Sequence, residues 1–440
     1  VVEGRRTAKR AERAAGAEKA SPRVVEADRS QLELRPVDLD GLIPLTHRAR
    51  AVWAFVERLD LSRFYEAIKS RGSQAGRPAT DPKVLVALWI YATSQGIGSA
   101  RELDRLCNEH DAYRWLRGGV TVNYHTLADF RTADERALDE LVSQVLAVMM
   151  QEGLINLKRV AQDGTRVRTS AGASSFRRRE RLEELLELAR QQVEAVKKQA
   201  DETVDTQKNA RRKAAQERAV RERMERVERA LEELKKVEAQ RALMKGGHKP
   251  KGHARASTTD AEARKMKMAD GGFRPAYNAQ LATDTESRVI VGAAITEDGT
   301  DYVHCAPMIE QIAERIGKKP EQALVDGGYA SKETVEAVSK AQVAIYAPAP
   351  RRNGSNDPYE ISRRDSEAVR AWKERMVSDE GQQTYKERAA TAETVNADLR
   401  TWRTLSNFLV RGKRKVHCVL LWNVLAYDLL RYFALTANST

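Results

Sequence analysis

A heptad repeat of apolar residues occupies the middle of the chain and requires long helices there. After the basic stretch FRRRE at residues 176–180, apolar side chains alternate four and three positions apart, break near residues 205–209 and then resume. The repeat consists of Leu182, Leu186, Ala189, Val193, Val196 and Ala200, followed by Val220, Met224, Val227, Leu231 and Leu234. Two such helices joined by a short polar turn predict an antiparallel helical hairpin, a two-helix coiled coil.

Residues 176–256 are therefore predicted to be an insertion, which ends in a flexible basic linker, MKGGHKPKGHARA, at 244–256. The many Arg, Lys and Glu side chains of the hairpin fit solvated helix faces with pairing between residues four apart. Two roles stay open at this point. The hairpin is either a surface for dimerisation or for clamping DNA, or an inert insertion that packs on itself.

The segment before the hairpin, residues 37–154, is predicted to be all-α. Apolar residues recur there at three and four positions. The tripeptide Thr80-Asp81-Pro82 is typical of a helix start, and so is Ser99 followed by Glu102 in a capping box. We therefore expect helices at 82–93 and 100–110.

These two helices are joined by a short turn that contains Gly96, so the pair is a candidate helix-turn-helix. Arg101 and Arg105 would be exposed on the second helix, where such motifs contact DNA. The alternative is that both helices are packing elements of a helical domain.

The net charge of +13 over 440 residues favours a polyanion as partner, because Lys and Arg contacts to phosphates release counterions. The three cysteines form no zinc or disulfide pattern, as expected in a reducing cytosol. No apolar run approaches the ~18 residues of a membrane span. The polar, basic tail at 1–36 is predicted to be disordered and not to be a secretory signal. A cytoplasmic protein without a membrane partner is expected.

The remainder of the chain, residues 155–175 and 257–440, alternates strands with helices. The expected elements are strands at 157–166, 275–283 and 288–296, a helix at 301–316, a strand at 322–325, a helix at 331–340, a strand at 343–347, helices within 362–400 and an apolar helix at 416–435. This order predicts an α/β core, with the hairpin inserted between its first and second strands.

One aspartate lies within a predicted strand of this core, and another directly follows one. Asp163 precedes Gly164 in VAQDGTRVR, and Asp326 directly follows the apolar run ALV of a short strand. The carboxyl ends of strands are where sites form in α/β domains, although an aspartate there is also a common loop or cap residue. Phosphodiester cleavage by two Mg²⁺ ions needs carboxylates that converge from different elements. The two aspartates are candidates for that role.

Three segments resemble the acidic motifs of bacterial insertion-sequence transposases of the DDE class. They are DGT at 163–165, DGGY at 326–329 and YKERAATAETVNADLR at 385–400, which resembles the family's Tyr-x-x-Arg…Glu…Lys/Arg helix. The stretches GRPATDPKVLVALWIYATSQGIGSARELDRL and STTDAEARKMKMADGGFRPAYNAQLATD are also similar to that family. The resemblance covers roughly residues 37–430. It implies an RNase H-like catalytic core with Asp163, Asp326 and Glu393 as catalytic and metal-binding residues.

The third acidic motif departs from the family's common spacing. Four residues separate Arg388 from Glu393 where three are usual, and the six-residue gap after Glu393 ends at Arg400 and not at a lysine. Glu393 and Arg400, seven apart, share one helix face. Arg388, five residues before Glu393, is expected to point elsewhere in an ideal helix. Glu387 and Asp398 are competing acids that do not keep the Glu-to-Arg spacing.

The resemblance also implies a reaction and its partners. The enzyme would cleave transposon ends with Mg²⁺, for which Mn²⁺ can substitute, and join them to target DNA as a homodimer or larger assembly near the bacterial nucleoid. Contacts to DNA are expected from Tyr385, Arg388, Arg400 and a basic cluster before the last helix. That cluster comprises Arg411, Lys413, Arg414 and Lys415. It is alternatively a solvated patch.

A few other residues near these motifs also have two interpretations. Trp402 either stacks on a flipped base or packs in the core, with the core preferred. Asp260 is expected to be a cap and Asp284 a hairpin-turn residue. Three rival functions stay open: a decayed or domesticated transposase that only binds DNA, a plain RNase H-like nuclease without strand transfer, and a structural coiled-coil protein.

Overall fold

The computed structural model describes residues 38–72, 78–202, 207–244, 252–350 and 357–437, and side chains at 199–210 are not among those described. The tail at 1–36 therefore lies outside the described residues, as do parts of the turn near 205–209 and of the linker at 244–256. The chain divides into two compact units, Val1–Gly41 and Leu42–Thr440. A short helix, η1 (Asp40–Leu42), lies at the boundary. The elements below belong to the second unit.

The segment up to residue 152 is helical in its described part. Its elements are α2 (Arg48–Val56), α3 (Ser62–Glu66), α4 (Pro82–Ser94), α5 (Ala100–Glu109), α6 (Asp111–Arg117), α7 (Tyr124–Arg131) and α8 (Glu135–Gln151). The two predicted helix starts are confirmed, because the Asp81 carboxylate accepts from the Lys83 amide and the Ser99 hydroxyl accepts from the Glu102 amide. Every residue of α4 except Lys83 is buried, so this helix forms the centre of the segment.

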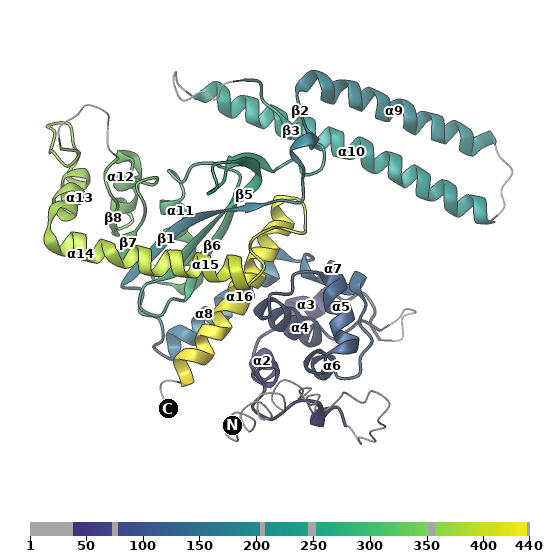
Figure 1. Cartoon of the computed structure of the whole chain (residues 1–440), viewed down its shortest axis with the longest axis horizontal. Helices are drawn as coiled ribbons and strands as arrows, with labels where there is room; N and C mark the ends of the chain where they lie inside the picture. Colours follow the sequence, from purple (N-terminus) through teal and green to yellow (C-terminus); the bar gives the residue numbers. More distant parts are fainter. Residues whose placement is uncertain (1–37, 73–77, 203–206, 245–251, 351–356, 438–440) are drawn as a thin grey trace, which may run out of the picture. The chain divides into compact units, whose positions relative to one another are not determined.

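A mixed sheet follows, with β1 at its centre (Figure 1). Its strands are β1 (Arg159–Arg168), β4 (Arg264–Lys267), β5 (Phe273–Asp284), β6 (Ile290–Thr296), β7 (Gln322–Leu324) and β8 (Ala344–Tyr346). β5 runs antiparallel to β1 and pairs on its other edge with β6 and β4, also antiparallel. β7 and β8 run parallel to β1 on the opposite side. This is the strand arrangement expected of an RNase H-like core.

Helices cover the sheet and connect its strands. They are α11 (Cys305–Ile316), α12 (Lys332–Lys340), α13 (Glu367–Val377), α14 (Asp379–Arg388), η4 (Ala389–Glu393), α15 (Thr394–Trp402) and α16 (Lys413–Ala437). α11 begins at Cys305 and not at the predicted residue 301, because residues 301–304 form a turn in which Asp301 accepts bonds from the sheet. The segment η4 is a π-helix, which the sequence did not predict.

The C-terminal helix α16 packs against α4, α8 and β6, so it joins the helical segment to the sheet (Figure 1). It begins at Lys413, which corrects the expectation that Lys413 and Lys415 precede the helix. It is also long and apolar enough to cross a membrane by length and composition, contrary to the expectation that no run approaches that length. Of its most apolar window, 72% is buried inside the molecule, which is the setting of a core helix.

The heptad segments form α9 (Arg179–Glu202) and α10 (Gln207–Leu243), two helices that run side by side from a small ribbon of β2 (Phe176–Arg177) and β3 (Ala256–Ser257) (Figure 1). A short 3-10 helix, η2 (Ala173–Ser175), precedes the ribbon. The buried contacts between the two helices come from Leu182, Val227, Ala230 and Leu234, and Ala256 of the ribbon joins them. Apolar burial is therefore concentrated at the base of the hairpin.

Candidate active site

Asp163 lies on β1, and Asp326 lies two residues after the neighbouring strand β7. Asp163 is in the middle of β1 opposite Leu281 of β5. β7 pairs with β1 in parallel, with Leu324 beside Ala161. Continuing that register by two residues brings Asp326 beside Asp163, and the pleat of the sheet turns both aspartates to the same side. The two acids that the sequence singled out are thus adjacent.

The environment of Asp163 disfavours its negative charge. Burial raises the pKa of this carboxyl to about 6, while Arg388 lowers it and Asp326 and Asp301 raise it further. The amide of Gly164 donates to one carboxylate oxygen over 2.9 Å, and the Asn396 side chain donates to the other over 3.2 Å. Asp326 accepts a bond of 2.7 Å from the amide of Gly328, two residues along its own loop.

The π-helix η4 changes where Arg388 points. A π turn is closed by hydrogen bonds between residues five apart, so it brings Arg388 and Glu393 closer to one face of the helix than an α-helix would. The expectation that Arg388 points away is therefore wrong. The side chain is half-buried, and its guanidinium interacts with Asp163, Asp326 and Tyr385. Burial would lower the pKa of Arg388, but these neighbours outweigh burial and raise it.

The residue inserted in this helix explains the unusual spacing of the third motif. One extra residue in an α-helix produces a π turn, and the turn restores the alignment that three intervening residues would give in a regular helix. Two hydroxyls bond backbone carbonyls around the turn: Thr391 donates to the carbonyl of Glu387 over 2.9 Å, and Thr394 to that of Ala390 over 2.8 Å.

Glu393 is exposed and borders the same cavity as Asp163, of about 540 Å³. Asn396 and Arg400 line it too, as the shared helix face of Glu393 and Arg400 predicts. The competing acids are engaged elsewhere. Glu387 pairs with Arg159 at 2.6 Å and also accepts from Thr285, while Asp398 pairs with Arg403 at 3.1 Å.

This cavity continues into a second one, of about 780 Å³, and we call the two together the trough. They share Gly164, Thr165, Arg400 and Ser406. The second cavity adds Arg166 and Arg168 of β1 and residues 268–270. The trough therefore has carboxylates in its first part and three arginines along it. Its one further acid, Asp270, is bonded to Arg274 at 2.7 Å.

The sequence did not predict a polar network that lies close to Gly164. Asp301 accepts from Asn278 over 2.7 Å and from Gln280 over 2.6 Å, and Tyr329 of the DGGY motif donates to Gln280. Gly164 packs so closely on this network that a Cβ there would lie 2.5 Å from an Asp301 oxygen. The alternation of Asn278 and Gln280 along β5 was visible in the sequence, but nothing in it linked them to Asp301.

The other predicted DNA contacts lie in different surroundings. Tyr385 is half-buried beside Arg388. Arg101 stacks over the ring of Tyr124, and Arg105 pairs with Glu102 and Glu109 on its own helix. Lys413 pairs with Glu297 at 3.2 Å, and Lys415 is exposed. Among the described residues, Arg101, Arg105, Lys413 and Lys415 do not line the trough.

Two minor interpretations are wrong and one is confirmed. Trp402 is 65% exposed and is not part of the core. Asp260 is not a helix cap: it is buried and accepts from the Tyr277 hydroxyl over 2.8 Å and the Gly412 amide over 3.2 Å. Asp284 is a turn residue, because its carboxylate accepts from both the amide and the hydroxyl of Ser287.

The donor atoms at the aspartates suit a hard divalent ion. Carboxylate oxygens from Asp163 and Asp326 are the ligands that Mg²⁺ prefers. Asn396 adds a buried side-chain oxygen, which has no hydrogen-bond partner within the described part of the chain. In that same part no three His, Cys, Asp or Glu side chains already form a metal cluster. The fit therefore rests on these three residues, with exposed Glu393 on the shared cavity.

The sheet order and the adjacent aspartates on its central strands define an RNase H-like domain. Residues 244–429 match the family model described as "Transposase DDE domain", and residues 37–133 match "Transposase domain (DUF772)". The two matches identify the chain as an insertion-sequence transposase of the DDE class. Asp163 precedes the first matched range, whereas Asp326 and Glu393 lie inside it. No curated protein and no solved structure matches the chain.

Proposed function

We propose that this transposase cleaves transposon ends and joins them to target DNA through divalent metal ions held by Asp163, Asp326 and Glu393. The observation that carries the proposal is the pairing of β1 with β7, whose register brings the two aspartates side by side. Asp163 also borders the trough, which Glu393 and three arginines line. Bound Mg²⁺ or Mn²⁺ would activate the attacking oxygen and stabilise the leaving oxygen.

The chain's own residues would hold and orient the reactants. Asn396 and the Gly164 amide fix the two oxygens of Asp163. Arg388 balances part of the negative charge of the aspartates before a metal binds, and Tyr385 holds Arg388. Arg400, Arg166 and Arg168 would bind phosphates of a strand lying in the trough, because guanidinium groups pair with phosphate oxygens in a bidentate way.

The same proposal assigns the domains. Residues 37–154 would form the DNA-binding domain, with Arg101 and Arg105 as contacts, and residues 155–175 and 257–440 the catalytic domain. Arg101 is exposed, but the ion pairs of Arg105 must open for it to reach DNA. A dimer or larger assembly is expected because two ends have to be joined, and the reaction places the protein in the cytoplasm.

The test is cleavage of DNA that carries the ends of the transposon, with Mg²⁺, by wild type, Asp326→Ala and Glu393→Gln. Both variants should bind the DNA but cut it at least about a hundredfold more slowly, because a metal ligand is worth several kcal/mol to the transition state. Glu387→Gln is the matched control. Glu387 lies on the same continuous helix as Glu393, but its carboxylate pairs with Arg159 of β1. It should cut at nearly the rate of wild type.

Other outcomes lead to different conclusions. If Glu393→Gln cuts normally and Glu387→Gln does not cut, Glu387 and not Glu393 is the third metal-binding acid. Wild type that binds but cuts with neither Mg²⁺ nor Mn²⁺ would identify a decayed transposase that acts as a DNA-binding protein. Cut ends without any joined product would identify a nuclease without strand transfer.

A further inference from the structure

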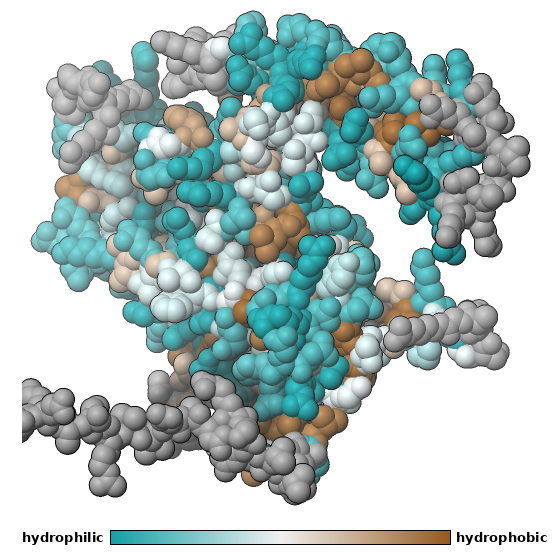
Figure 2. Space-filling model, turned by 45° about the vertical axis from the view of Figure 1, so that its right-hand side comes forward, coloured by the Kyte–Doolittle hydropathy of each residue, from teal (hydrophilic) through white to brown (hydrophobic). Residues whose placement is uncertain are grey.

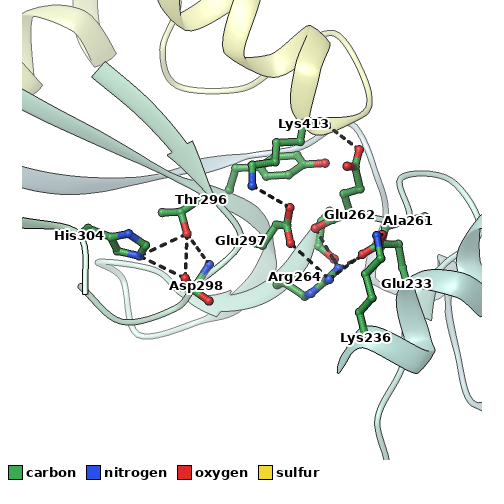
Figure 3. A network of polar contacts seen from close by, with 12 residues as sticks. Glu233, Lys236, Ala261, Glu262, Arg264, Thr296, Glu297, Asp298, His304 and Lys413 are labelled. Atoms are coloured by element: carbon green, nitrogen blue, oxygen red, sulfur yellow. Dashed lines mark hydrogen bonds and ion pairs between the residues drawn. The ribbon is translucent and has the colours of Figure 1, made fainter. Parts of the chain in front are cut away.

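The base of the hairpin is fixed to the catalytic core by a chain of ion pairs (Figure 3). Glu233 of α10 is 9% exposed and binds Arg264 of β4 at 2.9 Å and Lys236 at 2.6 Å. Arg264, itself 15% exposed, also approaches Glu297 after β6 at 3.6 Å, and Lys413 at the start of α16 binds Glu297 at 3.2 Å. One network thus connects α10, β4, β6 and α16.

This network gives the hairpin a defined position. Burial alone would raise the pKa of Glu233, but hydrogen bonds from Lys236 and Arg264 lower it, so the carboxylate stays charged at neutral pH. A buried charge that loses its partner is strongly unfavourable. α10 is therefore held in one orientation relative to the start of α16, and side chains on their facing surfaces keep a constant separation.

A cavity of about 460 Å³, which we call the hairpin groove, lies between these two elements. Arg226 and Arg229 of α10 line one wall, and Arg411, just before α16, and Lys415, in its first turn, line the other. All four side chains are exposed. Thr258, Thr259, Ala261 and Gly412 line the rest together with four acids.

Three of the four acids in the hairpin groove are engaged within the protein. Glu233 belongs to the ion-pair network, Asp260 accepts from Tyr277 and from Gly412, and Glu262 accepts from the Lys413 amide over 2.8 Å. Burial also raises the pKa of Asp260. Glu232 is the remaining acid, and it is exposed. The cations of the two walls therefore outnumber the accessible carboxylates.

One hydrogen bond joins a residue of the hairpin groove to the chain segment that follows β1. Arg411 donates to the hydroxyl of Ser170 over 3.2 Å, and Ser170 lies two residues beyond Arg168, which lines the trough. Ser170 thus links Arg411 of the hairpin groove to the segment that carries Arg168 of the trough. The face of the molecule in Figure 2 is mostly hydrophilic, with apolar residues in separate patches. Four exposed cations around one groove suit a partner with evenly repeated negative charge.

We propose that the hairpin groove binds the phosphate backbone of the transposon-end DNA beyond the cleavage site, so that the inserted hairpin is a DNA-binding part of the catalytic domain. Duplex DNA carries one negative charge about every 1.7 Å of its axis, so its backbone offers several phosphates to the four cations of the hairpin groove. The inference rests on the proposed function for the position of the cleavage site. Of the roles left open for the hairpin, this inference favours contact with DNA over dimerisation and over an inert insertion.

The experiment compares the full-length double variant Arg226→Ala/Arg229→Ala with Arg218→Ala/Arg221→Ala. The control pair removes the same charge from exposed positions on the same helix that do not line the hairpin groove. Binding is measured over a range of salt concentrations, with an end duplex that stops near the cleavage site and with a longer one. Melting curves of both variants verify that the fold is intact.

On the long duplex, the groove variant should bind about tenfold more weakly, and its salt dependence should fall by about two ions. Its affinity for the short duplex, and its cutting at saturating protein, should match wild type. Equal losses in both double variants, or no loss in either, would overturn the proposal, as would a changed oligomeric state with unchanged salt dependence. Because the readout is binding, a wild type that fails to cut would overturn only the proposed catalysis.

Discussion

At the scale of single residues, Asp163 is a carboxylate kept where its ionisation is unfavourable. Burial is the largest cause, and Asp326 and Asp301 add to it, while Arg388 and the Gly164 amide compensate only in part. A protein retains such a group when the charge serves a ligand that the folded chain alone does not supply. A divalent cation between the aspartates would be that ligand.

This arrangement predicts how stability depends on pH without metal. The pKa of Asp163 is about 6 in the folded chain against 3.8 for the ordinary group. Between these values the folded state holds a proton that the unfolded state has lost, so the free energy of unfolding falls as pH rises from about 4 to about 6. Asp163→Asn removes the ionisable carboxyl and with it this fall in the free energy of unfolding. The variant should therefore be more stable than wild type at pH 7.5 without metal, by about 3 kcal/mol at most.

Denaturant unfolding in EDTA at pH 4 and at pH 7.5 measures the effect. The difference between Asp163→Asn and wild type should be small at pH 4 and should appear at pH 7.5. Added Mg²⁺ should stabilise wild type alone and so reduce the difference in free energy of unfolding between the variant and wild type. A gap of the same size at both pH values would mean that the ionisation of Asp163 is not its origin.

At the scale of secondary structure, the sequence predicted the elements well and their irregularities poorly. The helix starts at Asp81 and Ser99 and the sequence of strands and helices along the core follow from capping residues and alternation, which are local signals. The π turn at Ala389–Glu393 was missed because helical periodicity alone does not predict it, although the extra residue between Arg388 and Glu393 is its trace in the sequence. The network of Asp301 was missed because its partners come from a strand more than twenty residues away.

The π turn leads to a prediction about chain length. Deleting Ala390, which is exposed, should convert η4 to regular α-helix and keep Arg388 and the glutamate on one face. Inserting one alanine after Ala390 should instead rotate them apart by about 100°. We expect the deletion to cut DNA within about tenfold of wild type, a cost of about 1.4 kcal/mol in the barrier, and the insertion to be inactive.

Cleavage assays and melting curves on both variants separate alignment from stability. Because each variant changes the chain by one residue at the same place, an equal loss of activity in both would show that the register of α14 or α15 matters more than the alignment of Arg388 with Glu393. A stable but inactive deletion variant would mean that the site requires the π turn itself.

At the scale of the whole molecule, one apolar core extends across the helical segment and the sheet. It includes Trp89 of α4, Leu138 of α8, Val291 of β6 and Trp422 of α16. The indole of Trp422 also donates to the carbonyl of Arg131 over 3.0 Å. The sequence predicted two domains here, with residues 37–154 separate from the catalytic core, and could not show that α16 packs into both because such packing is set by tertiary contacts.

A shared core predicts that the helical segment and the sheet unfold together. Trp422→Ala should lower the free energy of unfolding by about 3–5 kcal/mol, because the side chain is fully buried, and should leave a single transition. Trp402→Ala is the matched control: its side chain is 65% exposed, so its removal should change stability by less than about 0.5 kcal/mol. Circular dichroism follows the helices, and hydrogen exchange of the β1 amides follows the sheet. If the helical signal of Trp422→Ala is lost at lower denaturant while β1 stays protected, the two segments are separate folding units, and α16 only connects them.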